Sequence, residues 1–238
     1  MKRTRVLSAT IALVIAASSV AGAQGRGDDH GKGRDKDHPV PQAEQQKRIQ
    51  EEQSRSDQYR RHMQDQMRDQ QREQAQLQQD RRSAQYAAQQ RYEQELRDQQ
   101  RRIALTRDYN RDPYISTPHS YRYSVGGVNR VTNQYGVDVL KRAVNYGYQQ
   151  GIRAGQADRQ DRWKANYQNS IAYRDADYGY DGNYVDLSDY NFYFRQGFQR
   201  GYEDGYNQRS QYGGTSTAGV LGVAAAVLAG ILVLKAIN

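Results

Sequence analysis

The acidic stretch at residues 175–186 has the spacing most similar to that of a metal-binding loop. Its four aspartates are Asp175, Asp177, Asp181 and Asp186, and Gly182 follows the third of them. A calcium loop of this kind needs an oxygen ligand at its fifth position and a glycine at its sixth. Counted from Asp175, those positions hold Gly179 and Tyr180. We therefore expect a polar, solvated turn here, with a calcium site as the less favoured alternative.

No other group of residues has the spacing of a catalytic or cofactor site. The histidines are scattered along the chain, at His30, His38, His62 and His119. Neither a zinc-helix motif, a nucleophile elbow nor a phosphate-binding loop is present. The chain has no cysteine, which excludes thiol chemistry and zinc–thiolate sites. We expect no catalytic, cofactor-binding or metal-ligating residues, and a protein that is not an enzyme.

Tyrosine and arginine together are the remaining side chains that could bind a ligand. Most of the 20 tyrosines follow position 108, interleaved with arginine. Such side chains can stack on bases or sugars, although tyrosines in a small domain more often form its core and rim. The formal net charge is +8, and it falls to +5 if Lys2, Arg3 and Arg5 are removed with an export signal. This mild excess permits weak binding to anionic lipid, cell-wall polymer or nucleic acid without selecting among them.

A gapless internal repeat predicts how the tyrosine-rich region folds. Glycines recur every four residues in two copies that lie fifty positions apart: Gly147, Gly151 and Gly155, then Gly197, Gly201 and Gly205. A step of four places residues on one face of a helix. Glycine in a helix costs roughly 1 kcal/mol against alanine. We therefore expect two helices that pack closely through their glycine faces, with a flexible Gly/Tyr segment as the alternative.

Large apolar side chains run beside the glycines at the same step. They are Leu140, Val144, Tyr148 and Ile152 in the first copy and Tyr190, Phe194, Phe198, Tyr202 and Tyr206 in the second. The connector is long enough for the two helices to fold back antiparallel. Before them, residues 121–125 and 128–132 flank a Gly-Gly pair, which predicts a short β-hairpin. At residues 121–212 the chain resembles exported bacterial proteins of unknown function with Tyr/Gly-rich GYxxGxxxG-type repeats, and this resemblance implies a shared small domain but no activity.

A Gln- and Arg-rich segment precedes the repeat. It has no glycine or proline from Gln42 to Asp112 and is rich in helix formers. A continuous helix of this length would extend about 100 Å. Apolar residues at multiples of seven (Ile49, Met63, Leu77 and Ala84) suggest a coiled-coil seam, but the matching d positions are polar. We expect a solvated single helix or partly disordered rod, with a weak coiled coil as the alternative.

The two ends of the chain carry targeting patterns. Residues 1–23 have a basic start, an apolar stretch and an Ala21-Gly22-Ala23 end, as in a cleavable export signal. Residues 215–234 carry no charge and would span about 30 Å as a helix, the thickness of a membrane core. Within them Gly222, Ala226 and Gly230 form a small-residue pattern that is compatible with self-association.

The sequence therefore predicts a mainly α protein. The expected segments are a signal peptide (1–23), a disordered linker (24–40), a long polar helix or weak coiled coil (41–108), a Tyr/Gly-repeat helical-hairpin domain (109–212) and a C-terminal transmembrane segment (213–238). The expected function is that of a non-enzymatic cell-envelope protein, anchored in a membrane with its bulk outside the cytoplasm. The alternative is a module that binds anionic polymer, glycan or nucleic acid through its Tyr/Arg surface. No cofactor and no specific nucleic-acid partner are expected.

Overall fold

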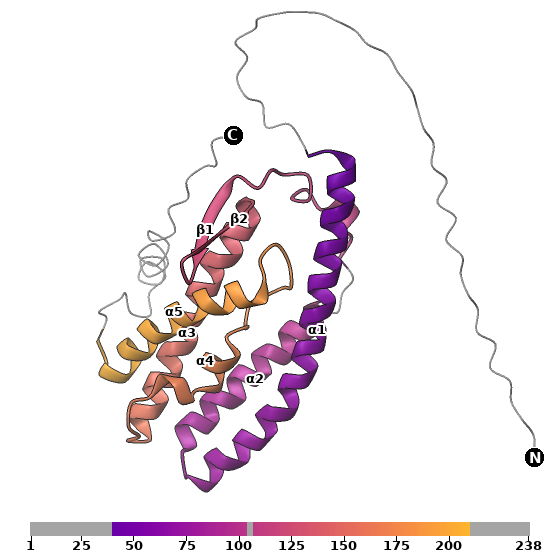
Figure 1. Cartoon of the computed structure of the whole chain (residues 1–238). Coiled ribbons are helices and arrows are strands. Elements are labelled where there is room, and N and C mark those ends of the chain that lie inside the picture. The colour runs from indigo at the N-terminus through magenta and orange to yellow at the C-terminus, as the bar shows by residue number, and fades with distance from the viewer. Residues whose placement is uncertain (1–39, 104–106, 210–238) are drawn as a thin grey trace, which may run out of the picture. The chain divides into compact units, whose positions relative to one another are not determined.

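The computed structural model describes residues 40–103 and 107–209. The fold is mainly helical with one two-stranded antiparallel sheet in the described part (Figure 1). Its elements are α1 (Gln42–Gln79), α2 (Ser83–Ile103), η1 (Tyr109–Arg111), β1 (Tyr121–Val125), β2 (Val128–Thr132), α3 (Gln134–Gln160), η2 (Tyr167–Asn169), α4 (Ile171–Asp175) and α5 (Leu187–Asn207).

The Gln- and Arg-rich segment forms two helices, which corrects the expectation of one long helix. The chain turns between α1 and α2, where Arg81 adopts a φ of 56°. The carboxylate of Asp161, at the end of α3, accepts hydrogen bonds from the backbone amides of Ala84 and Gln85, each at 2.9 Å. A carboxylate in this place caps the first turn of α2. The break between α1 and α2 therefore depends on a contact with a residue almost eighty positions away. Helix propensity, which reflects only neighbouring residues, could not predict it.

The α1–α2 hairpin is also not a solvated rod. Met63 and Leu96 lie in the same buried cluster as α3 and α5, and Ile49 packs with Tyr109 and Ile115. Ile49 and Met63, two of the four residues that suggested a coiled-coil seam, therefore face their own domain. Buried glutamines accompany them, because burying a neutral amide costs less than burying a charged group. These are Gln70, Gln85, Gln89 and Gln99.

The predicted β-hairpin is confirmed. Val125 pairs with Val128 across the turn, and the antiparallel ladder extends from there to the Tyr121–Thr132 pair. Gly126 and Gly127 have φ of 57° and 84°. Two consecutive positive φ values match the tight hairpin turn whose twist suits the flanking strands. Non-glycine residues disfavour this backbone conformation, so the Gly-Gly pair determines the turn.

The six repeat glycines meet at the crossing of α3 and α5. A Cβ added at any of them would lie closer than 3.0 Å to a backbone atom of the other helix. The contacts are pseudo-symmetric: Gly151 faces the carbonyl oxygen of Phe198, and Gly201 faces that of Tyr148. In each case the contacted carbonyl lies three residues before the glycine's counterpart in the other copy. Backbones this close allow Cα–H···O contacts, which recur at tight helix crossings.

The large side chains beside the glycines form the core. Tyr148, Phe194 and Phe198 are fully buried. Two buried tyrosine hydroxyls, one in each copy of the repeat, are paired with aspartates of the other helix. Tyr148 donates to Asp204 at 2.6 Å, and Tyr202 donates to Asp158 at 2.6 Å. These pairs join α3 and α5 in both directions, so the core is held by packing together with polar bonds.

The expectations for both ends of the chain lie outside the described residues. These are the signal peptide and nearly all of the linker at one end, and the apolar segment with Gly222, Ala226 and Gly230 at the other. Among the helices between residues 40 and 209 that the structure describes, none is long and apolar enough to cross a membrane.

Candidate ligand-binding site

An open cleft of about 620 Å³ lies where the α1–α2 hairpin meets the connector between α4 and α5. We call it the tyrosine cleft. Its volume is in the range typical of small-molecule sites. It is lined by aromatic, cationic and polar side chains together, including Gln53, Ser56, Asp57, Arg60, Gln99, Arg102, Arg107, Tyr109, Tyr146, Tyr178, Asp181 and Asn183. This mixture of ring faces and converging polar groups is suited to binding a polar ligand.

Gln99 of α2 holds the connector in place beneath the cleft. Its side-chain amide donates to the carbonyl oxygen of Tyr180 at 2.8 Å and to the hydroxyl of Tyr59 at 2.8 Å. Its oxygen accepts from the backbone amide of Gly179 at 2.6 Å. When the NH₂ group and the oxygen of a buried side-chain amide are both hydrogen-bonded, any rotation of that side chain would break a bond. Gln99 therefore fixes the connector relative to both helices of the hairpin.

Tyr146 of α3 and Tyr178 of the connector form the aromatic wall of the cleft. Their ring centroids are 5.2 Å apart in an edge-to-face arrangement. Gly179 lies directly against the Tyr146 ring, where a Cβ would overlap it, and has a φ of 91°. Neither tyrosine hydroxyl hydrogen-bonds to another described residue. Partial burial raises the pKa of Tyr178, so its hydroxyl keeps its proton and can donate to a ligand.

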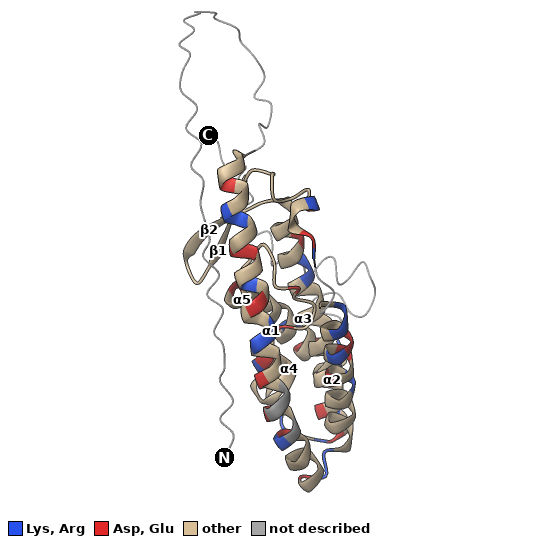
Figure 2. Ribbon diagram, turned by 90° about the vertical axis from the view of Figure 1, so that its right-hand side faces the viewer, with Lys and Arg blue, Asp and Glu red and all other residues tan. Residues whose placement is uncertain are grey.

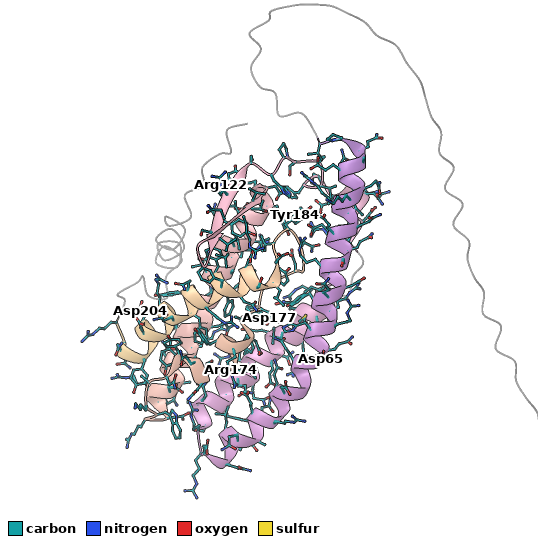
Figure 3. All side chains as sticks on the ribbon, viewed as in Figure 1. Asp65, Arg122, Arg174, Asp177, Tyr184 and Asp204 are labelled. Carbon is teal, nitrogen blue, oxygen red and sulfur yellow. The ribbon has the colours of Figure 1, made fainter. Side chains whose placement is uncertain are left out.

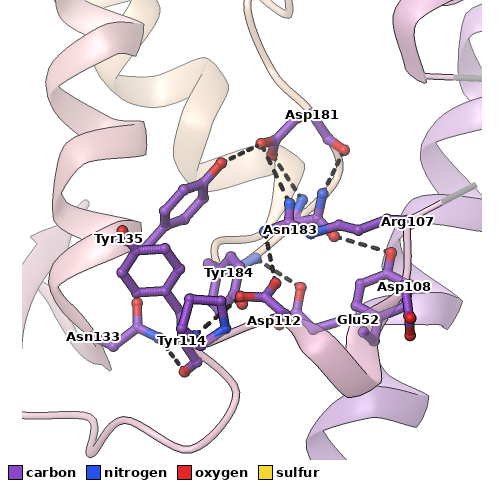
Figure 4. Close-up of polar contacts among 12 residues, drawn as sticks. Glu52, Arg107, Asp108, Asp112, Tyr114, Asn133, Tyr135, Asp181, Asn183 and Tyr184 are labelled. Carbon is purple, nitrogen blue, oxygen red and sulfur yellow. Dashed lines mark hydrogen bonds and ion pairs between the residues drawn. The ribbon is translucent and has the colours of Figure 1, made fainter. Parts of the chain in front are cut away.

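The charges around the cleft are mostly paired within the protein (Figure 4). Arg107 contacts Asp112 at 2.6 Å and Asp181 at 3.9 Å. Tyr135 donates to Asp181 at 2.9 Å, and Tyr109 donates to Asn183 at 3.0 Å. These contacts make the far wall rigid before any ligand arrives.

Two arginines lie at the rim on the hairpin side of the cleft. Arg60 pairs with Asp57, and both side chains are about half exposed. Arg102 is exposed and forms no ion pair with any residue in the described part of the chain. Of the cleft's cationic side chains, Arg102 is therefore the one available to a ligand.

A second polar group, which we call the acid cluster, lies between the hairpin and the connector. It consists of His62, Gln70, Tyr92, Asp175 and Asp177. Asp177 is completely buried, and Tyr92 donates to it at 3.3 Å. Gln70 donates to Asp175 at 3.1 Å. Figure 3 shows Asp177 between the α1–α2 hairpin and α5. The expectation of a solvated turn is thus wrong at Asp177, which the hairpin covers completely, whereas Asp175 keeps partial exposure.

Burial also changes the protonation of the acid cluster. It raises the pKa of Asp175 to about 7, with the nearby Asp177 carboxylate adding to the effect. Burial likewise raises the pKa of Asp177, against the opposing effect of His62. Within the described part of the chain, no group of three or more carboxylates and imidazoles is arranged to hold a metal ion.

The sequence-predicted residues and the candidate site lie in different places. The six repeat glycines are brought together, but they form the α3–α5 contact and are not among the residues that line the tyrosine cleft. His119 lines a smaller pocket, and His62 joins the acid cluster. Gln99, Arg102 and His62 were missed because the hairpin was expected to be solvated. Tyr59 and Tyr92, large rings within a Gln-rich helix, were the signal that one face of it is buried.

Comparison with known proteins yields no relative: no family model, no curated protein and no solved structure matches the chain.

Proposed function

We propose that this chain is a non-enzymatic cell-envelope protein that binds an oligosaccharide in the tyrosine cleft. The observation that carries the proposal is that Tyr146 and Tyr178 line a cleft of about 620 Å³ together with Arg102, and that neither hydroxyl nor this guanidinium is paired with a described residue. A sugar offers apolar C–H faces for aromatic rings and hydroxyls for hydrogen bonds. Tyrosine provides an apolar ring and a polar tip in one side chain.

The charge distribution favours a glycan over a nucleic acid. Asp57 and Asp181 line the cleft together with the arginines, and a continuous polyanion would be repelled by both. Sugar hydroxyls can instead donate to these carboxylates. Along the hairpin, basic and acidic residues alternate and do not form a positive stripe (Figure 2). Nucleic-acid affinity depends on such stripes, because phosphate contacts dominate it.

The location in the envelope is supported by the sequence. The export pattern of residues 1–23 and the uncharged run of residues 215–234 support a protein anchored by its C-terminus with its bulk outside the cytoplasm. An extracytoplasmic protein would meet cell-wall and surface glycans, which agrees with the ligand class proposed for the cleft. Self-association through Gly222, Ala226 and Gly230 is part of this proposal.

Removing the two cleft hydroxyls is expected to weaken oligosaccharide binding. The full-length protein would be screened against defined neutral and uronic-acid-containing oligosaccharides, and the best binder measured by calorimetry. The double variant Tyr146→Phe/Tyr178→Phe keeps both rings but loses two hydrogen bonds, each of about 1 kcal/mol. We expect binding about tenfold weaker or worse, since 1.4 kcal/mol is tenfold.

Two matched controls separate the cleft from general effects. Tyr121→Phe removes a hydroxyl on β1, away from the cleft, and should leave affinity unchanged. Arg102→Gln should weaken binding of acidic sugars, while Arg101→Gln, which changes the next residue outside the cleft, should not. Binding of a thymidine oligonucleotide in place of every oligosaccharide would contradict the proposed ligand class.

Membrane attachment is tested separately. We expect the full-length protein to stay with membranes after carbonate extraction, because about twenty apolar residues match the hydrocarbon thickness. A version truncated after Gly214 should be released. Equal release of both versions would show that residues 215–234 are not an anchor.

A further inference from the structure

The acid cluster contains two buried polar atoms that face each other without a hydrogen bond. The Nε2 atom of His62 lies 4.0 Å from the Oδ2 atom of Asp177. Neither atom forms a hydrogen bond of normal geometry in the described part of the chain, although the side chain of Gln66 also lies close to the Asp177 carboxylate. Unsatisfied buried polar atoms are uncommon and costly in native proteins. A proton held on the Asp177 carboxyl removes the charge from this buried group, whereas its loss leaves a buried carboxylate.

The atoms belong to opposite sides of one contact. His62 lies on α1, Tyr92 lies on α2, and both aspartates lie at the end of α4 and in the connector. The same contact forms the tyrosine cleft, because Gln53, Arg60 and Gln99 line it from the hairpin while residues 178–181 and Asn183 line it from the connector. Gln99 further accepts from Gly179, two residues after Asp177. Whatever loosens the hairpin from the connector therefore separates the walls of the cleft.

We propose that the acid cluster is a protonation-dependent latch that holds the α1–α2 hairpin against the connector and so regulates ligand binding in the tyrosine cleft. The inference about ligand binding rests on the proposed function, whereas the latch itself does not. In the docked state a proton is held on the carboxyl pair. Its release to solvent leaves negative charge in a buried site, and separation of the hairpin lets water reach that charge.

The other ionisable groups around Asp175 and Asp177 do not compensate the negative charge that forms when the proton leaves. Tyr59 of α1, Tyr92 of α2 and Tyr190 of α5 face it, and burial raises the pKa of each, so they stay neutral. Near Asp175, Arg174 is paired with Glu73 of α1. The His62 side chain, which is partly exposed, lies 4.0 Å from the Asp177 carboxylate.

The direction of the pH dependence follows from the raised pKa values. The docked state keeps a proton that the separated state releases, since the pKa of Asp175 rises from 3.8 to about 7 on docking. Docking is therefore strongest below about pH 4 and weakens as pH rises toward 7. For one proton the docking equilibrium changes about tenfold per pH unit in this window and levels off above it.

The chain carries its own probe of docking. Trp163 is the only tryptophan, and the guanidinium of Arg82 lies 4.5 Å from its ring centroid. Arg82 lies in the turn of the α1–α2 hairpin, while Trp163 follows α3. Separation of the hairpin removes this cation from the ring, so tryptophan fluorescence of the ligand-free full-length protein reports the latch.

The test is a fluorescence titration from pH 4 to pH 9. We expect one transition that is complete near pH 7–8 in the parent, is lost in Asp175→Asn and Asp177→Asn, and moves to higher pH in His62→Gln. Asp138→Asn, an exposed carboxylate paired with Lys141, is the control and should keep the parent's curve. Asp158 pairs with Arg82 beside the Trp163 ring, so titration of Asp158 alone would also change the fluorescence. A transition that persists unchanged in both Asp175→Asn and Asp177→Asn would therefore overturn the proposal.

Two additions keep the outcomes distinct. If Asp177→Asn fails to fold by circular dichroism, the less buried Asp175→Asn decides. The best-binding oligosaccharide is then measured at pH 5.5 and pH 8, and we expect at least tenfold tighter binding at pH 5.5. A fluorescence transition without any oligosaccharide binding would overturn the proposed function but keep the latch. Binding that is equal at both pH values would show that the latch does not regulate the cleft.

Discussion

Gly151→Leu is expected to destabilise the protein by about 3 kcal/mol, at the top of the usual range for overpacking. The reason is that a Cβ at Gly151 would meet the backbone of Phe198 and Tyr202. Backbone atoms of a packed helix cannot move aside as a flexible side chain can. Gly201→Leu should have a similar effect, because it faces the backbone of Tyr148 in the pseudo-symmetric position.

Thermal unfolding followed by circular dichroism measures this effect. The matched control is Gln149→Leu, which adds the same side chain to an exposed position of α3 between two of the glycines. Leucine is also the better helix former, so Gln149→Leu should not lower the melting temperature. If Gly151→Leu and Gln149→Leu melt together, close packing through the glycine faces is wrong.

Arg82→Ala is expected to cost about 3–5 kcal/mol, the usual penalty for removing one partner of a buried ion pair. Arg82 pairs with Asp158, and both side chains are more than nine-tenths buried. The substitution leaves the Asp158 carboxylate with the hydroxyl of Tyr202 as its remaining described partner. It also removes the cation from the face of Trp163. We therefore expect the hairpin to lose one of its attachments to the end of α3, while the bonds from Ala84 and Gln85 to Asp161 remain.

A double variant distinguishes a lost ion pair from a lost side chain. Arg82→Met/Asp158→Asn removes both charges while keeping most of the volume and leaving Tyr202 an acceptor. It should be more stable than Arg82→Ala, since no unpaired charge stays buried. Arg101→Ala, which breaks an exposed pair with Asp98, serves as the surface control. A melting temperature for Arg82→Ala equal to that of Arg101→Ala would contradict the buried pair's role.

The sequence by itself determined the features that depend on neighbours along the chain. The Gly-Gly pair at 126–127 specifies the β-hairpin because only that turn uses two positive φ values. The step of four in the glycine rows predicts a helix face, and the structure places all six glycines at one crossing. Freedom from glycine and proline predicts helix in the Gln-rich segment, and both α1 and α2 form there.

The tertiary structure decided where that helix breaks and what it covers. The break between α1 and α2 depends on Asp161, and the tyrosine cleft depends on Gln99 bonding to the connector about eighty residues later. Glutamine is usually found at the protein surface. Gln99 is nevertheless buried, because both its NH₂ group and its oxygen form hydrogen bonds. The raised pKa values of Asp175 and Asp177 arise the same way, from a helix that covers them. The sequence pattern of one segment does not predict which distant residues will cover it or hydrogen-bond to it, because burial and hydrogen bonding depend on the tertiary surroundings.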